Sequence, residues 1–343
     1  ASSSSFTALH AQRHAAATPR GTTPPAESTA DPARSSPPPE TCGYACAHTL
    51  RGHAGAVFSL TSAKGQLFSA AQDAAVRVWP LGKGAAAAAA EPPASVELVG
   101  HAGFVRALAV SGGGALLFSG SADKSVRVWD TNTHVQLCAL SGHKHEVHAL
   151  AVHNDLLFSG AEDATIKVWN IASLKCIRTL AGANGHTGAV FALAVCGDPP
   201  VLASGSRDHT IRLWELSTLE WRQTCGTSHF DSVVAFAAVG NTLYSGSRDR
   251  HIKRWSLRDG ACLHSAVNAH DDWVCALAAS EADGLLVSGG RDGRIKLWGL
   301  ASFEDGAVGT LDGHSASVNR ILFQDGAIVS ASSDRTVRLW TKG

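Results

Sequence analysis

The chain has 343 residues, of which 45% are hydrophobic, and its 29 Lys and Arg balance its 29 Asp and Glu. This composition suits a packed core, and a formal net charge of zero gives no support to a nucleic-acid-binding protein. No run of uncharged apolar residues approaches the roughly 18 that a spanning helix needs, so we expect no membrane insertion. The eight cysteines form no CxxC pair, which favours reduced thiols in a reducing compartment, and no cofactor is predicted.

Residues 1–40 differ in composition from the rest of the chain. They hold seven of the twelve prolines, and Phe6 and Leu9 are their only large apolar side chains. Such a segment cannot bury enough surface to offset its ordering entropy, so we expect a disordered Pro/Ser/Ala-rich linker or tail before a folded domain at residues 41–343. A transit peptide is the alternative, which leaves organellar import open beside a cytoplasmic location. Because no methionine occurs, even at position 1, we also expect a piece excised from a longer protein.

From residue 41 onward the sequence consists of seven similar units. Each ends in a Trp, with an Asp six residues earlier, a Ser four residues before that Asp, and a His 20 or 22 residues before the Asp. Seven complete fits to one spacing make chance negligible, and internal repeats decide the architecture. In chain order the four positions are His53, Ser69, Asp73 and Trp79; His101, Ser119, Asp123 and Trp129; His143, Ser159, Asp163 and Trp169; His186, Ser204, Asp208 and Trp214; His229, Ser245, Asp249 and Trp255; His270, Ser288, Asp292 and Trp298; and His314, Ser330, Asp334 and Trp340.

Each unit is predicted to contain four β-strands. A valine four residues after the His starts an inner strand, a second strand carries the Ser, a tight turn carries the Asp, and a third strand with alternating apolar residues ends in the Trp. A fourth strand precedes the next His. The repeat length, five Gly-His pairs and the pair Trp129-Asp130 resemble the WD40 family, which implies an all-β, seven-bladed β-propeller.

The seventh unit lacks its own fourth strand, because three residues follow Trp340. A strand-like segment at Tyr44 to Leu50 has no Trp before it. We therefore predict that this N-terminal strand completes the last blade and closes the ring.

Ser, His and Asp in each unit could suggest the triad of a hydrolase. Seven identical sets argue against it, and the WD40 resemblance places these residues with the Trp in buried hydrogen-bond networks, so we predict no enzyme and no catalytic residue. The spacing of His143, His145 and His148 is similar to that of a metal site. His143 already belongs to a network, and alternate strand positions point to opposite faces, so no metal ligand is predicted.

Two other features suggest function. Arg254 precedes its Trp where the other six units carry Val or Leu, which indicates either a paired ion or a functional residue. The residue before each network Asp lies on the propeller rim, and the WD40 resemblance implies peptide contacts there and at positions three and five after each network His. The rim residues predicted to bind a protein partner, in particular an acidic peptide, are Arg207, Arg248, Arg291, Trp273, Phe104, Arg106 and Phe191. A solvated face without a partner is the alternative.

Residues 228–300 carry a more specific resemblance. Ser228-His229-Phe230-Asp231, Ile252-Lys253-Arg254-Trp255 and Asp271-Asp272-Trp273 are similar to the tail propeller of the WD40-tailed members of the fourth kinesin family. This implies a microtubule- or partner-binding tail of the cytoskeleton, with tubulin as an acidic partner. Leu67-Phe68-Ser69 also resembles propellers of ubiquitin ligases, so a substrate-recognition propeller and a freestanding scaffold remain alternatives.

Overall fold

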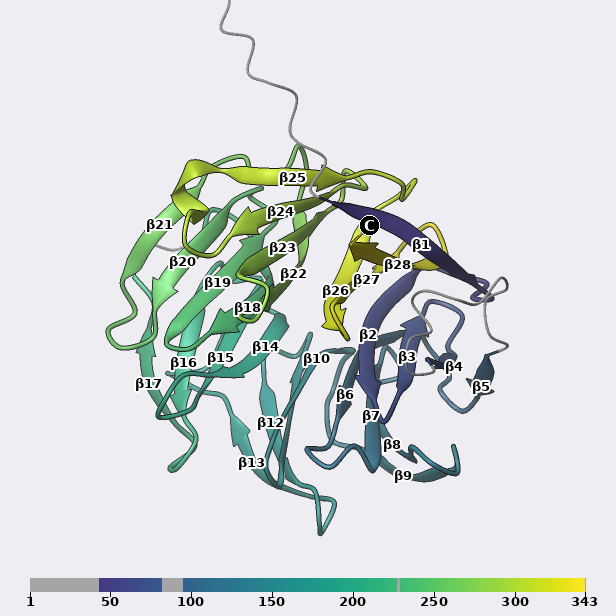
Figure 1. The fold of residues 1–343 in the computed structure, drawn as a ribbon. Coiled ribbons are helices and arrows are strands. Elements are labelled where there is room, and N and C mark those ends of the chain that lie inside the picture. Colours follow the sequence, from purple (N-terminus) through teal and green to yellow (C-terminus); the bar gives the residue numbers. More distant parts are fainter. Residues whose placement is uncertain (1–42, 82–94, 227–228, 343) are drawn as a thin grey trace, which may run out of the picture. The chain divides into compact units, whose positions relative to one another are not determined.

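The computed structural model describes residues 43–81, 95–226 and 229–342. In these ranges seven four-stranded antiparallel sheets follow one another around a central axis (Figure 1). This is the all-β, seven-bladed propeller that the repeat predicts. The predicted linker or targeting segment at residues 1–40 lies outside the described residues.

The chain runs through each blade from the innermost strand to the outermost. Blade one contains β2 (Val57–Ala63), β3 (Gln66–Ala71), β4 (Val76–Pro80) and β5 (Val96–Leu98), and blade two contains β6 (Val105–Val110), β7 (Leu116–Ser121), β8 (Val126–Asp130) and β9 (Gln136–Leu140). Blade three contains β10 (Val147–His153), β11 (Leu156–Ala161), β12 (Ile166–Asn170) and β13 (Lys175–Leu180), and blade four contains β14 (Val190–Cys196), β15 (Val201–Ser206), β16 (Ile211–Glu215) and β17 (Glu220–Thr224).

The remaining blades follow the same order with one addition. Blade five contains β18 (Val233–Val239), β19 (Thr242–Ser247), β20 (Ile252–Ser256) and β21 (Cys262–Ala266). Blade six contains β22 (Val274–Ser280), β23 (Leu285–Gly290), β24 (Ile295–Gly299), the 3-10 helix η1 (Phe303–Asp305) and β25 (Ala307–Leu311). Blade seven contains β26 (Val318–Gln324), β27 (Ala327–Ser332), β28 (Thr336–Lys342) and β1 (Tyr44–Arg51). No helix among these residues is long and apolar enough to cross a membrane.

The ring is closed by the two ends of the propeller. β1 pairs antiparallel with β28, from Tyr44 opposite Lys342 to Arg51 opposite Thr336, and the two strands lie side by side in Figure 1. Leu50 is buried in one apolar cluster with Val337 and Leu339. The predicted closure of the last blade by an N-terminal strand is confirmed.

The core lies between neighbouring blades. Each inner strand starts with a valine, and in five blades the residue after the network Ser, which faces the valine of the next blade, is a glycine with no room for a side chain. A Cβ placed on Gly120 would lie 2.7 Å from Cγ1 of Val147, and one on Gly205 would lie equally close to Val233. Close packing of this kind fixes the angle between blades and brings the seven inner strands together around one channel.

Candidate functional site

A hydrogen-bond network of identical composition occupies every blade. In blade four the Nδ1 atom of His186 lies 2.8 Å from Asp208, its Nε2 atom lies 2.7 Å from the Ser204 hydroxyl, and the Trp214 indole donates to that hydroxyl at 2.8 Å. The same three contacts occur in the other six blades. Each serine of the network is fully buried, so no substrate can reach its hydroxyl.

The protonation states of the network residues favour a complete set of hydrogen bonds. Burial alone would raise the pKa of the Asp123 carboxyl, but hydrogen bonds from Ser125 and His101 outweigh it and lower that pKa to about 2. Burial lowers the pKa of His101, against a smaller opposite effect of Asp123, so the ring is neutral near pH 7. A neutral ring donates to Asp123 through Nδ1 and accepts the Ser119 proton through Nε2, while Trp129 donates to Ser119. Each of these three donors in the network then has an acceptor.

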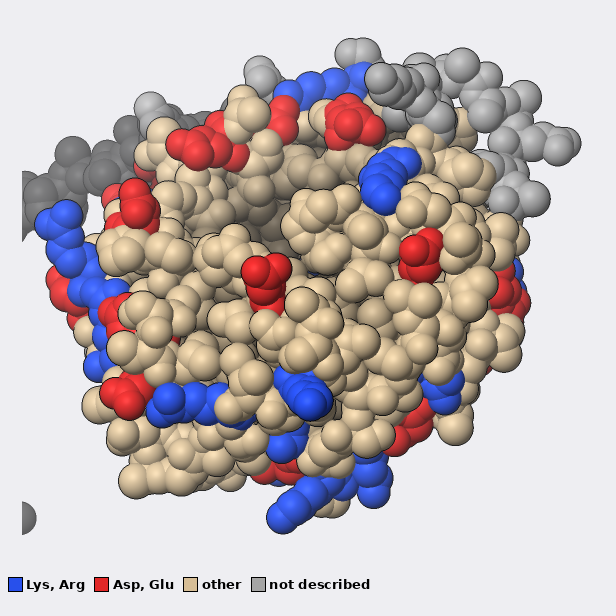
Figure 2. Space-filling view, turned by 90° about the horizontal axis from the view of Figure 1, so that it is seen from below, with Lys and Arg blue, Asp and Glu red and all other residues tan. Residues whose placement is uncertain are grey.

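A cavity of about 720 Å³ occupies the channel between the inner strands. Its described lining includes four arginines and no Asp or Glu: Arg106, Arg248, Arg291 and Arg320. On the face shown in Figure 2, by contrast, acidic and basic side chains lie in small groups among uncharged ones, as expected for a net charge of zero. The positive charge is therefore concentrated locally, inside the channel.

Four of the predicted rim residues form a stack at the mouth of this channel. The Arg248 guanidinium lies 5.1 Å from the ring centre of Phe191 and 4.4 Å from that of Trp273. The Arg291 guanidinium lies 4.3 Å from the centre of the same Trp273 ring. We call Phe191, Arg248, Trp273 and Arg291 the arginine–tryptophan stack. It joins blades four, five and six, and two cations share one indole.

The other three predicted rim residues lie apart from this stack. Arg106 packs over Phe104 at 5.7 Å and donates to Glu146 at 2.8 Å. Arg207 donates to Glu162 at 2.6 Å and does not line the cavity. The three arginines of blades four to six therefore do not form one continuous surface, because Arg207 is paired with the acid at the equivalent position of blade three.

Arg320 lines the channel and was not among the residues predicted from the sequence. The signal was present in the repeat. The residue six places after each network His is Ser59 or an alanine in the other six blades: Ala107, Ala149, Ala192, Ala235 and Ala276. A long cation at a position that elsewhere carries a small side chain marks blade seven as different.

Arg254 has an acidic partner in the next blade. Its guanidinium donates to Glu304 of η1 at 2.9 Å, and it also hydrogen-bonds Tyr244 in the neighbouring strand. Phe303 packs edge-on against Tyr244 with ring centres 5.3 Å apart. Of the two interpretations of Arg254, these contacts favour the paired ion, and Arg254 does not line the cavity.

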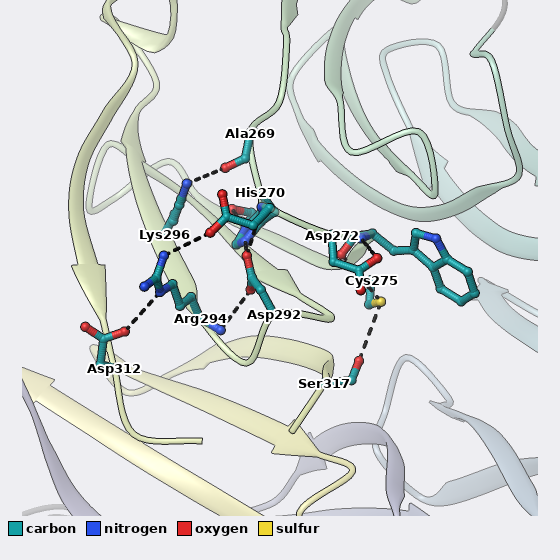
Figure 3. A network of polar contacts seen from close by, with 12 residues as sticks. Ala269, His270, Asp272, Cys275, Asp292, Arg294, Lys296, Asp312 and Ser317 are labelled. Carbon is teal, nitrogen blue, oxygen red and sulfur yellow. Dashed lines mark hydrogen bonds and ion pairs between the residues drawn. The ribbon is translucent and has the colours of Figure 1, made fainter. Parts of the chain in front are cut away.

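Charged residues of blade six also have partners within the protein. Arg294 lies 3.1 Å from Asp271 and 3.6 Å from Asp312, and the Lys296 ammonium donates to the Ala269 carbonyl at 2.7 Å (Figure 3).

In the segment with the three closely spaced histidines, His148 forms a hydrogen bond with Glu162 at 2.9 Å. Within residues 43–81, 95–226 and 229–342, no group of three or more His, Cys, Asp or Glu is arranged to hold a metal ion.

Comparison with known proteins agrees with this geometry. The family described as "WD domain, G-beta repeat" matches residues 44–80, 93–130, 134–170, 174–215, 223–256, 260–299 and 306–341, one stretch for each blade. The chain belongs to the WD40 family. Propellers of this family are generally protein-interaction scaffolds, bind protein partners and are typically not catalytic.

Individual relatives match only parts of this WD40 chain. The kinesin-like protein KIF21A of Homo sapiens is 33% identical over 112 residues, which are 33% of this chain and 7% of the relative. The small ribosomal subunit protein RACK1 of Candida albicans is 40% identical over 85 residues, 23% of this chain and 27% of the relative. The WD40 β-propeller domain of Doa1 superposes with a TM-score of 0.76 at 23% identity and covers 88% of this chain and 98% of its own, which shows the fold alone.

Proposed function

We propose that this propeller binds an acidic segment of a protein partner at the mouth of its channel, as the partner-binding tail of a kinesin-like protein. The observation that carries the proposal is the arginine–tryptophan stack. Two guanidinium groups lie 4.4 and 4.3 Å from one indole ring, at the edge of a cavity without a carboxylate in its described lining.

The stack has the composition of a binding hot spot. Trp and Arg dominate the energetics of protein interfaces, because a large flat ring and a planar cation bury much area while losing little conformational freedom. Each guanidinium can hold a carboxylate through two parallel hydrogen bonds. Stacking on Trp273 fixes the planes of Arg248 and Arg291 before the partner arrives, which lowers the entropic cost of binding.

The ion pairs of the rim indicate which arginines are available. Arg106 and Arg207 each have a carboxylate within 2.8 Å, so a partner would have to compete with Glu146 or Glu162. Arg291 approaches Asp272 only at 3.9 Å, and Arg248 forms no ion pair among the described residues. We therefore take Arg248 and Arg291 as the anchors of the acidic segment, and Phe104, Arg106 and Arg207 as flanking contacts.

The kinesin-like assignment is supported by sequence similarity. The partial match to a kinesin-like protein agrees with the resemblance of residues 228–300 to kinesin tail propellers. Kinesins work on microtubules, whose tubulin subunits end in acidic tails, so these tails are the partner that we propose. Their carboxylates suit the two anchor arginines.

Co-sedimentation with microtubules tests the proposal. Wild type is compared with Arg248→Glu/Arg291→Glu and with a control of identical charge, Lys175→Glu/Arg258→Glu, which changes two exposed residues outside the cavity. We expect wild type and control to bind, binding to weaken with salt, and the Arg248/Arg291 variant to lose at least about tenfold in affinity. Microtubules stripped of their acidic tails should release the wild type.

A second arm separates the two parts of the proposal. A fluorescent acidic peptide should bind the wild type and not the Arg248/Arg291 variant. If the peptide binds but microtubules do not, the acidic-segment site stands and the kinesin-like assignment is wrong, which favours a ligase receptor or a scaffold. Equal binding by the two double variants would exclude the stack as the site.

A further inference from the structure

Arg320 occupies a position that the other blades keep small. In all seven blades the register of the inner strand shifts between its first valine and the residue two places on, so these residues are equivalent in backbone geometry as well as in sequence. The equivalents of Arg320 are Ser59 and five alanines, all buried. Blade seven departs from its own repeat here by introducing a long cation.

The Arg320 side chain lines the channel, is exposed to its solvent and has no protein partner among the described residues. The strands around the channel lower the pKa of its guanidinium through desolvation. Among the described residues Arg320 has neither an ion pair nor a hydrogen bond. The cavity lining also contains Leu150, Leu193 and Phe236, whose side chains cannot accept a hydrogen bond. β26 lies beside the axis in Figure 1, between β2 and β22.

The polar side chains at the start of β26 are already engaged with one another. Asn319 donates to the Val57 carbonyl at 2.7 Å and to the Ser333 hydroxyl at 2.9 Å, and it accepts from Ser317 at 2.9 Å. This network ties blade seven to blade one and holds the start of β26 in place. Arg320 is the residue after Asn319, so its backbone is held in a rigid strand. The five N–H donors of its guanidinium remain unused.

We propose that the channel contains an anion site centred on Arg320, and that its ligand is a small compound with at least two phosphate groups. The Arg320 guanidinium is exposed in the channel and has no acidic partner, so it is available to an anion, and several arginines around one cavity attract an anion more strongly than a single exposed charge does. A guanidinium binds a phosphate oxygen pair through its planar fork. The same cavity contains three more arginines and no described carboxylate, which favours a ligand with several negative charges.

The size of the cavity agrees with this class of ligand. About 720 Å³ lies within the range of roughly 300 to 1,000 Å³ that small-molecule sites occupy. The proposal goes beyond the binding of an acidic protein segment at the mouth and is tested separately through Arg320, which lies on β26 and is not part of the stack, although Arg248 and Arg291 line the same cavity.

Titration calorimetry with inorganic pyrophosphate tests the site. The variants are Arg320→Ala, which gives blade seven the residue of five other blades, and Arg294→Ala, which removes the same charge outside the cavity. We expect saturable binding by wild type and Arg294→Ala, and binding about tenfold to a hundredfold weaker for Arg320→Ala, the loss of a charge-assisted hydrogen bond. Sulfate at equal ionic strength should bind more weakly than pyrophosphate.

Thermal unfolding gives an independent measure. Without ligand, Arg320→Ala should melt within about 2 °C of wild type, because the guanidinium is exposed and has no partner to lose. Pyrophosphate should raise the melting temperature of wild type and of Arg294→Ala but not of Arg320→Ala.

A doubly phosphorylated peptide distinguishes the source of the phosphates. If it binds through Arg320 and pyrophosphate does not, the phosphate groups come from a partner protein.

Two results would overturn the proposal. One is equal pyrophosphate binding by Arg320→Ala and Arg294→Ala, which would place the anion elsewhere. The other is absence of saturable binding of both pyrophosphate and the phosphopeptide by a folded wild type. The stack has its own test, because Arg248→Glu/Arg291→Glu leaves Arg320 in place and is measured with unphosphorylated acidic ligands.

Discussion

The buried networks and the channel lining are built on the same seven repeats and behave in opposite ways. Each network contains the same four residues with contacts that agree closely from blade to blade. At the residue after the first valine of each inner strand, the chain instead has Phe58, Arg106, His148, Phe191, Val234, Cys275 and Asn319. Repeated positions thus support the architecture, and varied positions on the same backbone are free to specify a ligand.

The largest expected effect comes from removing the strand that closes the ring. A chain beginning at Gly52 lacks β1, so the edge of β28 loses its ladder, and Val337 and Leu339 lose the contact with Leu50. We expect the thermal midpoint to fall by more than about 10 °C, or folding to fail. A chain beginning at Gly43 keeps β1 and is the control. Equal midpoints by circular dichroism for both chains would contradict the closure.

Lowering the pH should destabilise the fold through the buried networks before it changes binding at the channel. The network carboxyls have lowered pKa values, about 2 for Asp123 and Asp292, so their stabilisation is present above their usual range and is lost as the pH falls toward 2. Burial also lowers the pKa of His53, His101, His229 and His314, and the unfolded chain binds protons first, which reduces stability below pH 6.5. Both effects have the same sign.

Urea unfolding as a function of pH measures this. The midpoint should be flat from pH 8 to 7, decline below about 6.5 and fall steeply below about 4. Binding of the acidic peptide should stay constant from pH 8 to 6.5, because arginine does not titrate there. A midpoint that rises on acidification would show that the network histidines are charged in the folded state.

A single network is expected to matter more than any residue of the stack. Asp208→Ala leaves His186, the Thr187 amide and the Thr210 hydroxyl without their acceptor, and it should cost about 3 kcal/mol of unfolding free energy. Arg248→Ala removes only ring contacts at the mouth and should cost about 1 kcal/mol or less. Urea denaturation compares the two. Equal losses would mean that the stack is part of the architecture.

The sequence was sufficient to predict the fold because the repeat specifies it seven times. Residues placed by the repeat, such as the network of Asp208 or the closing strand Tyr44–Arg51, required no knowledge of long-range packing. The pairing of Arg207 with Glu162 could also have been predicted, since both precede the network Asp in adjacent blades. Such neighbours are brought together by the geometry of the ring.

What could not be predicted lies between the repeated landmarks. Glu304, the partner of Arg254, is 50 residues away in the irregular connection that forms η1, where no spacing rule applies. The stacking of Arg248 and Arg291 on one indole depends on side-chain rotamers, which the repeat leaves open. Arg320 differs from these two cases, because the sequence did contain a signal for it. That signal is a departure from the repeat, and it becomes visible only when the seven units are aligned at that position.

The smallest expected effect concerns blade five, where a pair of tyrosine and arginine replaces an apolar pair. Tyr244 lies opposite Arg254, whereas Phe158 lies opposite Val168 in blade three. Arg254→Leu leaves the buried Tyr244 hydroxyl without this partner and should cost about 1 to 2 kcal/mol, while its other partner, Glu304, is half exposed and loses little.

Adding Tyr244→Phe should recover most of that loss, because the double variant has the apolar pattern of the other blades. A double-mutant cycle by urea denaturation should give a coupling of about 1 kcal/mol between the two side chains. Acidic-peptide binding should not change in any of the three variants, since Arg254 lies outside the cavity lining. Zero coupling would mean that Arg254 is retained for Glu304 and η1 alone, and loss of peptide binding would extend the binding surface from the channel mouth to blade five.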